Sequence, residues 1–309
     1  MAQHDADIDH RTLIAALSAE ERAFLLQRSD RAGLLHLAAH WGAIACIGTL
    51  IALKVPFWSA LIQVQGILIV FLFTTVHETI HGTAFRSDRL NHLVAAACGF
   101  LILLPPKWFR YFHFAHHRHT HDPERDPELA EPKPETVVQY LVYLSGLAYW
   151  RGQIRTLFAN AAGRNRDGFV PEKRRADLAG EARAYIAGYF IVAALSLTIA
   201  GNVIVWCWLV PVIVGQPFLR AYLLAEHTLC PHVVNMLENS RTTFTNVLVR
   251  YIAWNMPYHA EHHAYPAVPF HKLPAFHRVT KAHLGSTIRG YARFQGRLLA
   301  SFRSGRGDA

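Results

Sequence analysis

The chain has 309 residues, of which 52% are hydrophobic, and its mean hydropathy of +0.14 is unusual for a soluble enzyme and indicates membrane spans. The formal net charge is +9, and beside hydrophobic segments such a basic excess favours contact with anionic lipid over binding of nucleic acid. The four cysteines form no C-x-x-C pair, which argues against a disulfide framework or a cysteine-bound metal.

The amino-terminal part predicts a cytosolic helix followed by two membrane spans. Ser18 and Glu21 have the spacing of a helix capping box. The apolar runs 33–53 and 57–76 each have about the roughly 20 residues that cross a bilayer as a helix. Because only residues 54–56 separate the two runs, we expect a transmembrane hairpin with a very short turn.

The middle of the chain is polar and rich in histidine. The apolar run 93–104 is too short to span a bilayer, so we expect a re-entrant, interfacial or packed segment. Residues 141–158 predict an amphipathic helix lying on the membrane, because their tyrosines and tryptophan suit the interface. Residues 163–183 predict a basic loop.

A second hairpin is predicted after this loop. The apolar runs 184–201 and 203–224 have the length of two further spans, with a very short turn at residues 201–202. Pro211 and Pro217 should kink the last span.

The distribution of positive charge predicts the orientation in the membrane. The two short turns carry a single positive residue, Lys54, so the positive-inside rule places both termini and both large polar regions in the cytosol. We therefore predict a single multi-pass membrane domain over residues 1–309, divided into a cytosolic helix (1–32), a first hairpin (33–76), a cytosolic region (77–183), a second hairpin (184–224) and a second cytosolic region (225–309).

Most of the twenty histidines fall into tight groups on the predicted cytosolic side. Residues at i, i+3 and i+4 share one face of a helix, so each group can present its imidazoles to one point. Neutral imidazole binds iron, zinc and copper well, and eight such ligands are too many for one ion and about right for two. The groups are His77 and His81; His113, His116 and His117; and His259, His262 and His263.

Two other kinds of protein use such histidines. The first group also reads H-E-x-x-H, in which His77 and His81 would bind zinc and Glu78 would be the general base of a membrane metalloprotease. That alternative leaves the other six histidines without a role. A metal transporter would place histidines at the membrane midplane, whereas these lie beyond the ends of the spans.

In their order and between paired spans, the three groups resemble the membrane fatty acid desaturase and hydroxylase superfamily, over residues 77–277. The resemblance implies an all-α integral membrane protein whose cytosolic helical cap holds a non-haem di-iron centre, with two iron ions bound by the eight histidines. His227 stands where family members often add a histidine after the last span. Leu223 occupies a position where animal-type desaturases can have asparagine, and the pair Glu226 and His227 looks more like the hydroxylases.

Several residues near the groups are candidates to orient the ligands. Carboxylates can accept hydrogen bonds from the ring N–H groups of metal-binding histidines. We interpret His119 and His121, which have no partner at ligand spacing, as surface residues or as neighbours of the ligands. The candidate carboxylates are Glu78, Asp122, Asp126, Glu128 and Glu261.

The resemblance implies an O₂-dependent oxidoreductase that oxidises an unactivated C–H bond of a membrane lipid or fatty acyl chain by desaturation or hydroxylation. Another apolar substrate, such as a carotenoid, an alkane or the acyl or head group of a polar lipid, is the alternative. Only 46 residues follow the third group, and no cysteine set could hold an iron–sulfur centre, so we expect a separate electron donor of ferredoxin, rubredoxin or cytochrome type. Arginines in 164–183 and 289–306 could dock that donor or meet anionic lipid.

Overall fold

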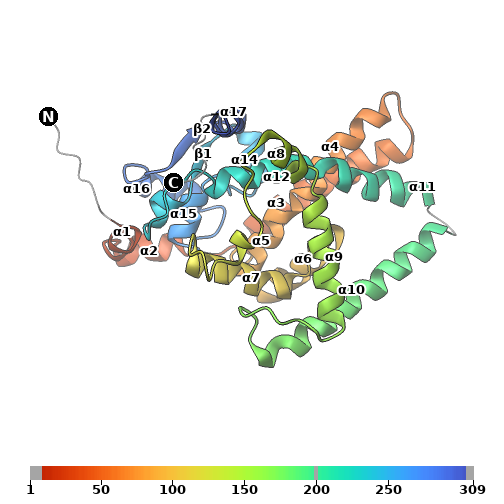
Figure 1. Cartoon of the computed structure of the whole chain (residues 1–309), viewed down its shortest axis with the longest axis horizontal. Coiled ribbons are helices and arrows are strands. Elements are labelled where there is room, and N and C mark those ends of the chain that lie inside the picture. The colour runs from red at the N-terminus through yellow and green to blue at the C-terminus, as the bar shows by residue number, and fades with distance from the viewer. Residues whose placement is uncertain (1–8, 198–200, 304–309) are drawn as a thin grey trace.

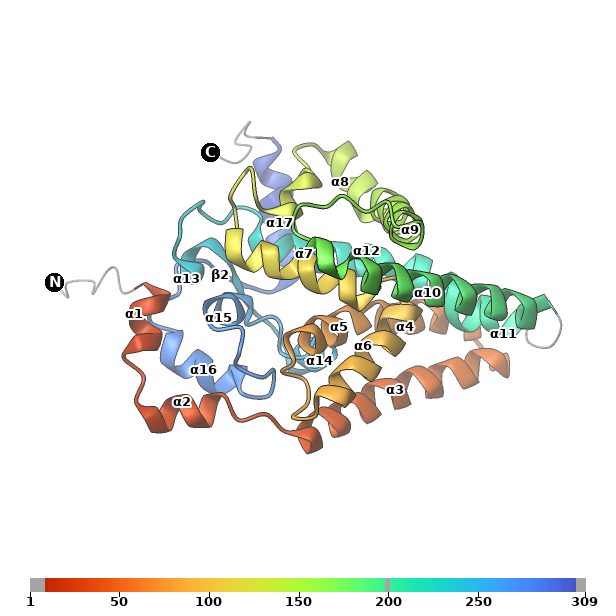
Figure 2. The ribbon, with the colours of Figure 1, turned by 90° about the horizontal axis from the view of Figure 1, so that it is seen from below.

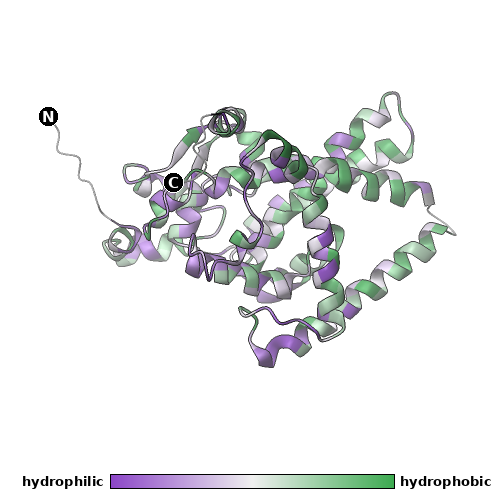
Figure 3. Ribbon diagram, in the orientation of Figure 1, coloured by the Kyte–Doolittle hydropathy of each residue, from purple (hydrophilic) through white to green (hydrophobic). Residues whose placement is uncertain are grey.

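The computed structural model describes residues 9–197 and 201–303, and most of them are helical (Figure 1). Within this part of the chain, four helical stretches are long and apolar enough to cross a membrane, or up to five if one bent pair counts as a span. The long helices extend together toward one end of the molecule, and the shorter carboxy-terminal helices gather at the other end (Figure 2). Hydrophobic residues are concentrated along the long helices (Figure 3). The four stretches are α3 (Asp30–Ala52); α4 (Trp58–Val70) with α5 (Leu72–His81); α10 (Arg175–Leu195); and α11 (Gly201–Ile204) with the π-helical η4 (Val205–Leu209) and α12 (Val210–His227).

The first two long stretches agree closely with the apolar runs of the sequence. Helix α3 ends at Ala52, and the turn that follows uses left-handed backbone at Lys54 and Phe57. Helix α5 ends at His81, where Gly82 adopts the left-handed conformation that commonly closes a helix. The first histidine group therefore lies on the last turns of a long apolar helix, as its spacing requires.

The boundaries predicted for the second hairpin need correction. The predicted basic loop is wrong for residues 175–183, because α10 already begins at Arg175. In its first turns Leu178 and Ala182 are buried, although charged residues stand beside them in the sequence. A search for continuous apolar runs does not detect such an amphipathic helix. The turn predicted at residues 201–202 is also wrong, since these residues begin α11; the adjoining residues 198–200 lie outside the described part.

Helices α4 and α12 approach each other through glycine. A Cβ atom on Gly66 would lie 2.3 Å from the carbonyl oxygen of Pro211, and one on Gly215 would lie 2.4 Å from the carbonyl carbon of Gly66. Any side chain at either position would force the helices apart, and small residues allow this kind of close packing in membranes. Two side chains support the contact: Gln63 Nε2 donates to Val214 O, and Gln65 Nε2 donates to Cys207 O, both at 3.1 Å.

The apolar run 93–104 belongs to a bent helix pair that packs against α5, the helix that carries the first histidine group. Helices α6 (Asp88–Leu101) and α7 (Pro106–His119) meet at 98°. Cys98, Ile102 and Leu104 are buried in one apolar cluster with Val76 of α5. This packing fixes the second histidine group, on α7, against the first.

The surface helix predicted over residues 141–158 is wrong as a single helix. Two helices, α8 (Val137–Leu144) and α9 (Leu147–Ala161), meet at Gly146, whose φ of +70° interrupts the helix. Leu141, Leu147 and Phe158 expose about 60% or more of their surface, which suits helices in contact with lipid. The 3-10 helices η1 (Pro127–Ala130) and η2 (Glu172–Arg174) lie in the loops before α8 and α10.

The remaining elements form a cap around the third histidine group. The predicted capping box is confirmed, because Ser18 Oγ accepts from Glu21 N at 3.1 Å and Glu21 Oε2 accepts from Ser18 N at 2.9 Å. Two three-residue strands pair in parallel, with Thr243 opposite Ile288, which qualifies the all-α prediction. The elements are α1 (His10–Ala15), α2 (Ala19–Leu25), α13 (Met236–Asn239), β1 (Thr242–Phe244), α14 (Val247–Ile252), α15 (His259–Ala264), α16 (Leu273–Thr280), β2 (Thr287–Arg289) and α17 (Tyr291–Ser301).

Candidate metal centre

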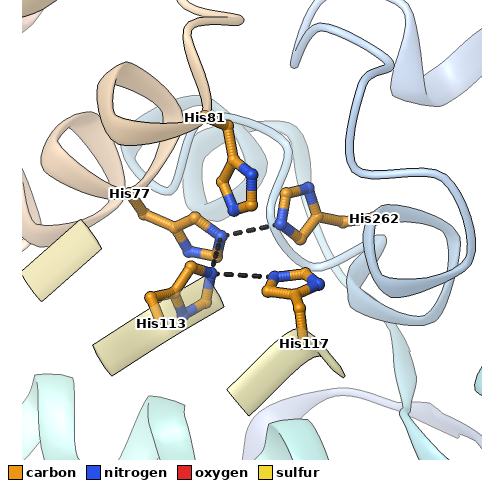
Figure 4. Close-up of side chains that lie close together, drawn as sticks. All are labelled: His77, His81, His113, His117 and His262. Carbon is orange, nitrogen blue, oxygen red and sulfur yellow. Dashed lines mark hydrogen bonds between the residues drawn. The ribbon is translucent and has the colours of Figure 1, made fainter. Parts of the chain in front are cut away.

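Five histidines from three helices converge on one point, and we call them the five-histidine group. Helix α5 contributes two, α7 contributes two, and α15 contributes one (Figure 4). One nitrogen of each ring lies within 4.8 Å of the corresponding nitrogens of the others. The i, i+4 pairs on α5 and α7 each place two rings on one helix face. The members are His77, His81, His113, His117 and His262.

A second set, the three-histidine group, lies beside the first. It consists of His116 on α7, His227 at the end of α12 and His263 on α15, with ligand nitrogens again within 4.8 Å of one another. His259 adjoins this group, since its Nε2 lies 2.9 Å from Nε2 of His227. Eight of the nine histidines singled out from the sequence therefore fall into two neighbouring sets, and His259 adjoins the smaller one.

The arrangement suits metal cations. In the five-histidine group, Nε2 of His77 lies 2.7 Å from that of His262 and 3.0 Å from that of His113. Nε2 of His81 and Nε2 of His263 are buried and have no hydrogen-bond partner in the part of the chain that the structure describes. Buried polar atoms are normally satisfied, so converging nitrogens without partners indicate a site for an ion.

Burial keeps the histidines of α15 in the form that binds metal. Burial lowers the pKa of His259 and of His263 well below the usual value and lowers the pKa of His262 to about 3. Their rings are therefore neutral at physiological pH, with a lone pair available. Imidazole is a donor that iron, zinc and copper accept.

Neighbouring acceptors fix the orientation of the three-histidine group. Asp126 Oδ1 accepts from Nδ1–H of His116 at 2.9 Å, and Nε2 of the same ring lies 3.1 Å from Nε2 of His227. The carbonyl of Asn239 lies 3.3 Å from Nδ1 of His227. Such partners set the tautomer and tilt of ligand rings. The sequence had suggested Asp126 for this role but not Asn239. Glu226 Oε1 lies 3.4 Å from Nδ1 of His259, which adjoins the group, but the two atoms are not hydrogen-bonded.

The other candidate carboxylates contact different partners. Glu78 accepts from Thr83 Oγ1 at 2.7 Å and from the backbone N–H of Phe270 at 3.2 Å. It thereby ties α5 to the segment before α16, and its proposed role toward a ligand ring stays a prediction. A metalloprotease would need Glu78 as a general base beside a zinc bound by His77 and His81. Glu78 instead accepts hydrogen bonds from the protein chain, and the two histidines belong to a set of five, which argues against that alternative.

Glu261 and Asp122 also hold the protein chain together. Glu261 accepts from Thr242 Oγ1 and from His277 Nδ1, both at 2.5 Å, and so joins α15 to β1 and α16. Asp122 accepts from Arg125 Nε at 2.7 Å in a turn at the surface. Their role toward the ligand rings likewise stays a prediction.

His119 and His121, which have no partner at ligand spacing, lie at the edge of the metal centre. His121 Nε2 lies 2.8 Å from the carbonyl of Asn239, the same carbonyl that His227 contacts, so it belongs to the surroundings of the three-histidine group. His119 is partly exposed at the end of α7.

Glu128 reaches the three-histidine group directly. Its Oε2 lies 3.0 Å from Nε2 of His116, and its Oε1 accepts from Lys133 Nζ at 3.2 Å. Burial alone would raise the pKa of Glu128, but the Lys133 ammonium together with His116 and His227 holds that pKa well below the usual value. Glu128 is therefore an anionic group that could also hold a metal ion.

A cavity of about 480 Å³ opens beside both histidine groups. His77, His113, His116 and His259 line one side of it, and the other walls come from α5, α7, α8, α9 and α12. The cavity is mostly apolar, but one part of it is charged. Its apolar wall includes Phe73, Leu104, Trp108, Phe109 and Phe112, and its charged part includes Glu128, Glu131, Lys133 and Arg220.

The family of the chain follows from its sequence matches. Residues 54–294 match the family model "Fatty acid desaturase", which covers more than half of the chain. The chain therefore belongs to the fatty acid desaturase family. The predicted resemblance to the membrane desaturase and hydroxylase superfamily is confirmed.

Curated proteins similar to the chain include carotenoid ketolases. Beta-carotene 4-ketolase 3 of Haematococcus lacustris is 30% identical over 106 residues, which are 30% of this chain and 32% of that protein. Zeaxanthin 4-ketolase of Chlamydomonas reinhardtii is 30% identical over 162 residues, which are 45% of this chain and 34% of that protein. The chain thus spans about a third of the length of the curated relatives it matches.

Proposed function

We propose that this protein binds two iron ions through its nine grouped histidines and uses O₂ to oxidise an unactivated C–H bond of an apolar molecule. The observation that carries the proposal is that two sets of converging imidazoles line one mostly apolar cavity. An unactivated C–H bond offers no proton that a side-chain base could remove, so the hard step needs a redox cofactor. Bound iron would supply that redox chemistry.

The residues of the chain would bind and orient the substrate. Phe73, Phe109 and Phe112 offer aromatic surface to an apolar chain or ring and exclude water from the cavity. Placement of the reacting carbon to within about an ångström decides which bond reacts. Asp126 would keep the ring of His116 in the orientation that directs Nε2 toward His227.

The substrate that we propose first is a lipid or fatty acyl chain, oxidised by desaturation or hydroxylation. A carotenoid is the second candidate, because the curated relatives include carotenoid ketolases. Both are long apolar molecules that reach the cavity from the bilayer. Two electrons would come from a separate ferredoxin, rubredoxin or cytochrome, and the arginines of residues 164–183 and 289–306 are its candidate docking surface.

We expect the purified protein to contain about two irons per chain, because each histidine group has the donors for one ion. The measurement is elemental analysis after purification under reducing conditions without chelators. Comparison of the lipids and carotenoids of cells with and without the gene, in the presence and absence of O₂, tests the oxidation. A single firmly bound zinc and no iron would contradict the proposal.

We further propose that residues 1–309 form one multi-pass membrane domain with two hairpins and cytosolic termini. A tag inserted at Lys54, between α3 and α4, should be labelled only from outside intact cells, whereas a tag at Arg174 should be labelled only after permeabilisation. An outward-facing Arg174 would refute the orientation.

A further inference from the structure

The cavity beside the histidines contains a buried arginine. Arg220 lies on the long helix α12, two turns before His227, and only 4% of its surface is exposed. A cation inside a span is costly and therefore often marks a functional site. Arg220 is also a residue that the sequence analysis passed over, although it is the single charge within the apolar run 203–224.

Arg220 is only partly satisfied by its neighbours. Its Nη2 lies 2.6 Å from Glu131 Oε2, and its guanidinium lies 3.8 Å from the centre of the Tyr143 ring. Its Nε and Nη2 nevertheless make no hydrogen bond among the described residues, and the same is true of the buried Oε1 of Gln153, which lines the same cavity. Unused donors of Arg220 and an unused acceptor of Gln153 therefore belong to residues that line one cavity.

The charges of this wall are balanced. Lys133 donates to Glu128 at 3.2 Å, and Arg220 pairs with Glu131, so each cation already has an anionic partner, and Glu226 lines the same cavity. An added carboxylate or phosphate would leave a net negative charge in a buried site, which is strongly unfavourable. A pure hydrocarbon would leave the unused donors and acceptor unsatisfied. A hydroxyl group is neutral, accepts one hydrogen bond and donates another.

We propose that Arg220, Glu131 and Gln153 form an anchor for a hydroxyl group carried by an otherwise apolar substrate. The inference rests on the proposed function, because it takes this cavity as the substrate site. It narrows the substrate class to hydroxylated lipids or terpenoids and excludes free fatty acids and hydrocarbons as preferred substrates.

Binding of three probes of equal chain length tests the anchor. Hexadecanol, hexadecane and palmitate would compete against a fluorescent fatty alcohol for the iron-loaded protein in nanodiscs. We expect hexadecanol to bind at least about tenfold more tightly than the other two, since sites built to bind a hydroxyl discriminate strongly against analogues that lack it. Equal binding of the three probes, a preference for palmitate or no binding at all would overturn the proposal.

Variants separate an anchor from a purely structural ion pair. Arg220→Gln should weaken hexadecanol binding about tenfold and leave hexadecane binding unchanged. Arg151→Gln, on the exposed face of α9, is the matched control and should preserve the preference. Glu131→Gln leaves one unbalanced cation, so palmitate should bind more tightly than in the wild type. An ion pair that only holds the segment after η1 against α12 would not reverse the preference between probes.

A double variant covers the case in which a single variant fails to fold. Arg220→Gln combined with Glu131→Gln leaves no unpaired buried charge, so the fold should persist while the preference for hexadecanol is lost. A folded double variant that keeps the preference would also overturn the anchor. Failure of the proposed function has a different signature, namely absence of iron from the wild type, whatever the three probes show.

Discussion

Replacing His227 by alanine should give a protein that still inserts into the membrane but has lost nearly all activity. His227 is one of only three histidines whose nitrogens converge in the smaller group, and it also contacts His259 at 2.9 Å. Loss of a partner that merely orients a ligand costs about 10–100-fold, so loss of the ligand itself should cost at least as much. Because the five-histidine group is untouched, the iron content should fall from about two to about one per chain.

The experiment needs activity, iron content and folding from the same preparation. His92→Ala is the control, since His92 is exposed on α6 and should retain iron and activity. His262→Ala is the reciprocal variant and should empty the five-histidine group instead. If His227→Ala kept full iron and near-normal activity, this histidine would not be a ligand.

Acidification should destabilise the folded protein and release its metal. Burial lowers the pKa of His259, His262 and His263 in the folded state, for His262 to about 3, whereas the unfolded chain titrates near about 6.5. Below that pH the unfolded chain takes up protons that the folded chain does not, so the free energy of unfolding falls as the pH falls. At about pH 5 each group would contribute a loss of up to ~2 kcal/mol. Protons also compete with metal for the same nitrogens.

Thermal unfolding and retained iron, measured between about pH 7.5 and about pH 5, test this expectation. Both the unfolding midpoint and the iron content should decrease over that interval, and the metal-free protein should show the decrease in midpoint as well. A midpoint that is constant or rises on acidification would contradict this expectation.

The local parts of the site could be predicted from the sequence. His77 with His81, and His113 with His117, lie four residues apart, and helix geometry alone brings each pair onto one face. Apolar runs of about the right length located the long helices. Polar residues are costly inside a bilayer, so helices that cross it consist mostly of apolar residues.

The rest of the site depends on contacts between distant segments. Which histidines converge on one point could not be read from spacing, since His116 and His117 are neighbours in sequence but join different groups. Asn239 and Glu226 become neighbours of the rings only when α12 and the cap meet. The early start of α10 and the break at Gly146 were missed because partly polar helices and single left-handed residues leave little signal in hydropathy.

The glycine contact between α4 and α12 has a consequence for how the enzyme could change its substrate. It lies within the apolar part of the spans, yet the helices it joins lead directly to His77 and His227. Direct backbone contact between the two helices therefore limits how far His77 and His227 can move relative to each other. The outer wall of the cavity belongs to α8 and α9, which take no part in that contact. We therefore expect the histidine scaffold to stay rigid when the cavity-facing residues of α8 and α9 are changed, except where Tyr143 and Gly146 pack on α12.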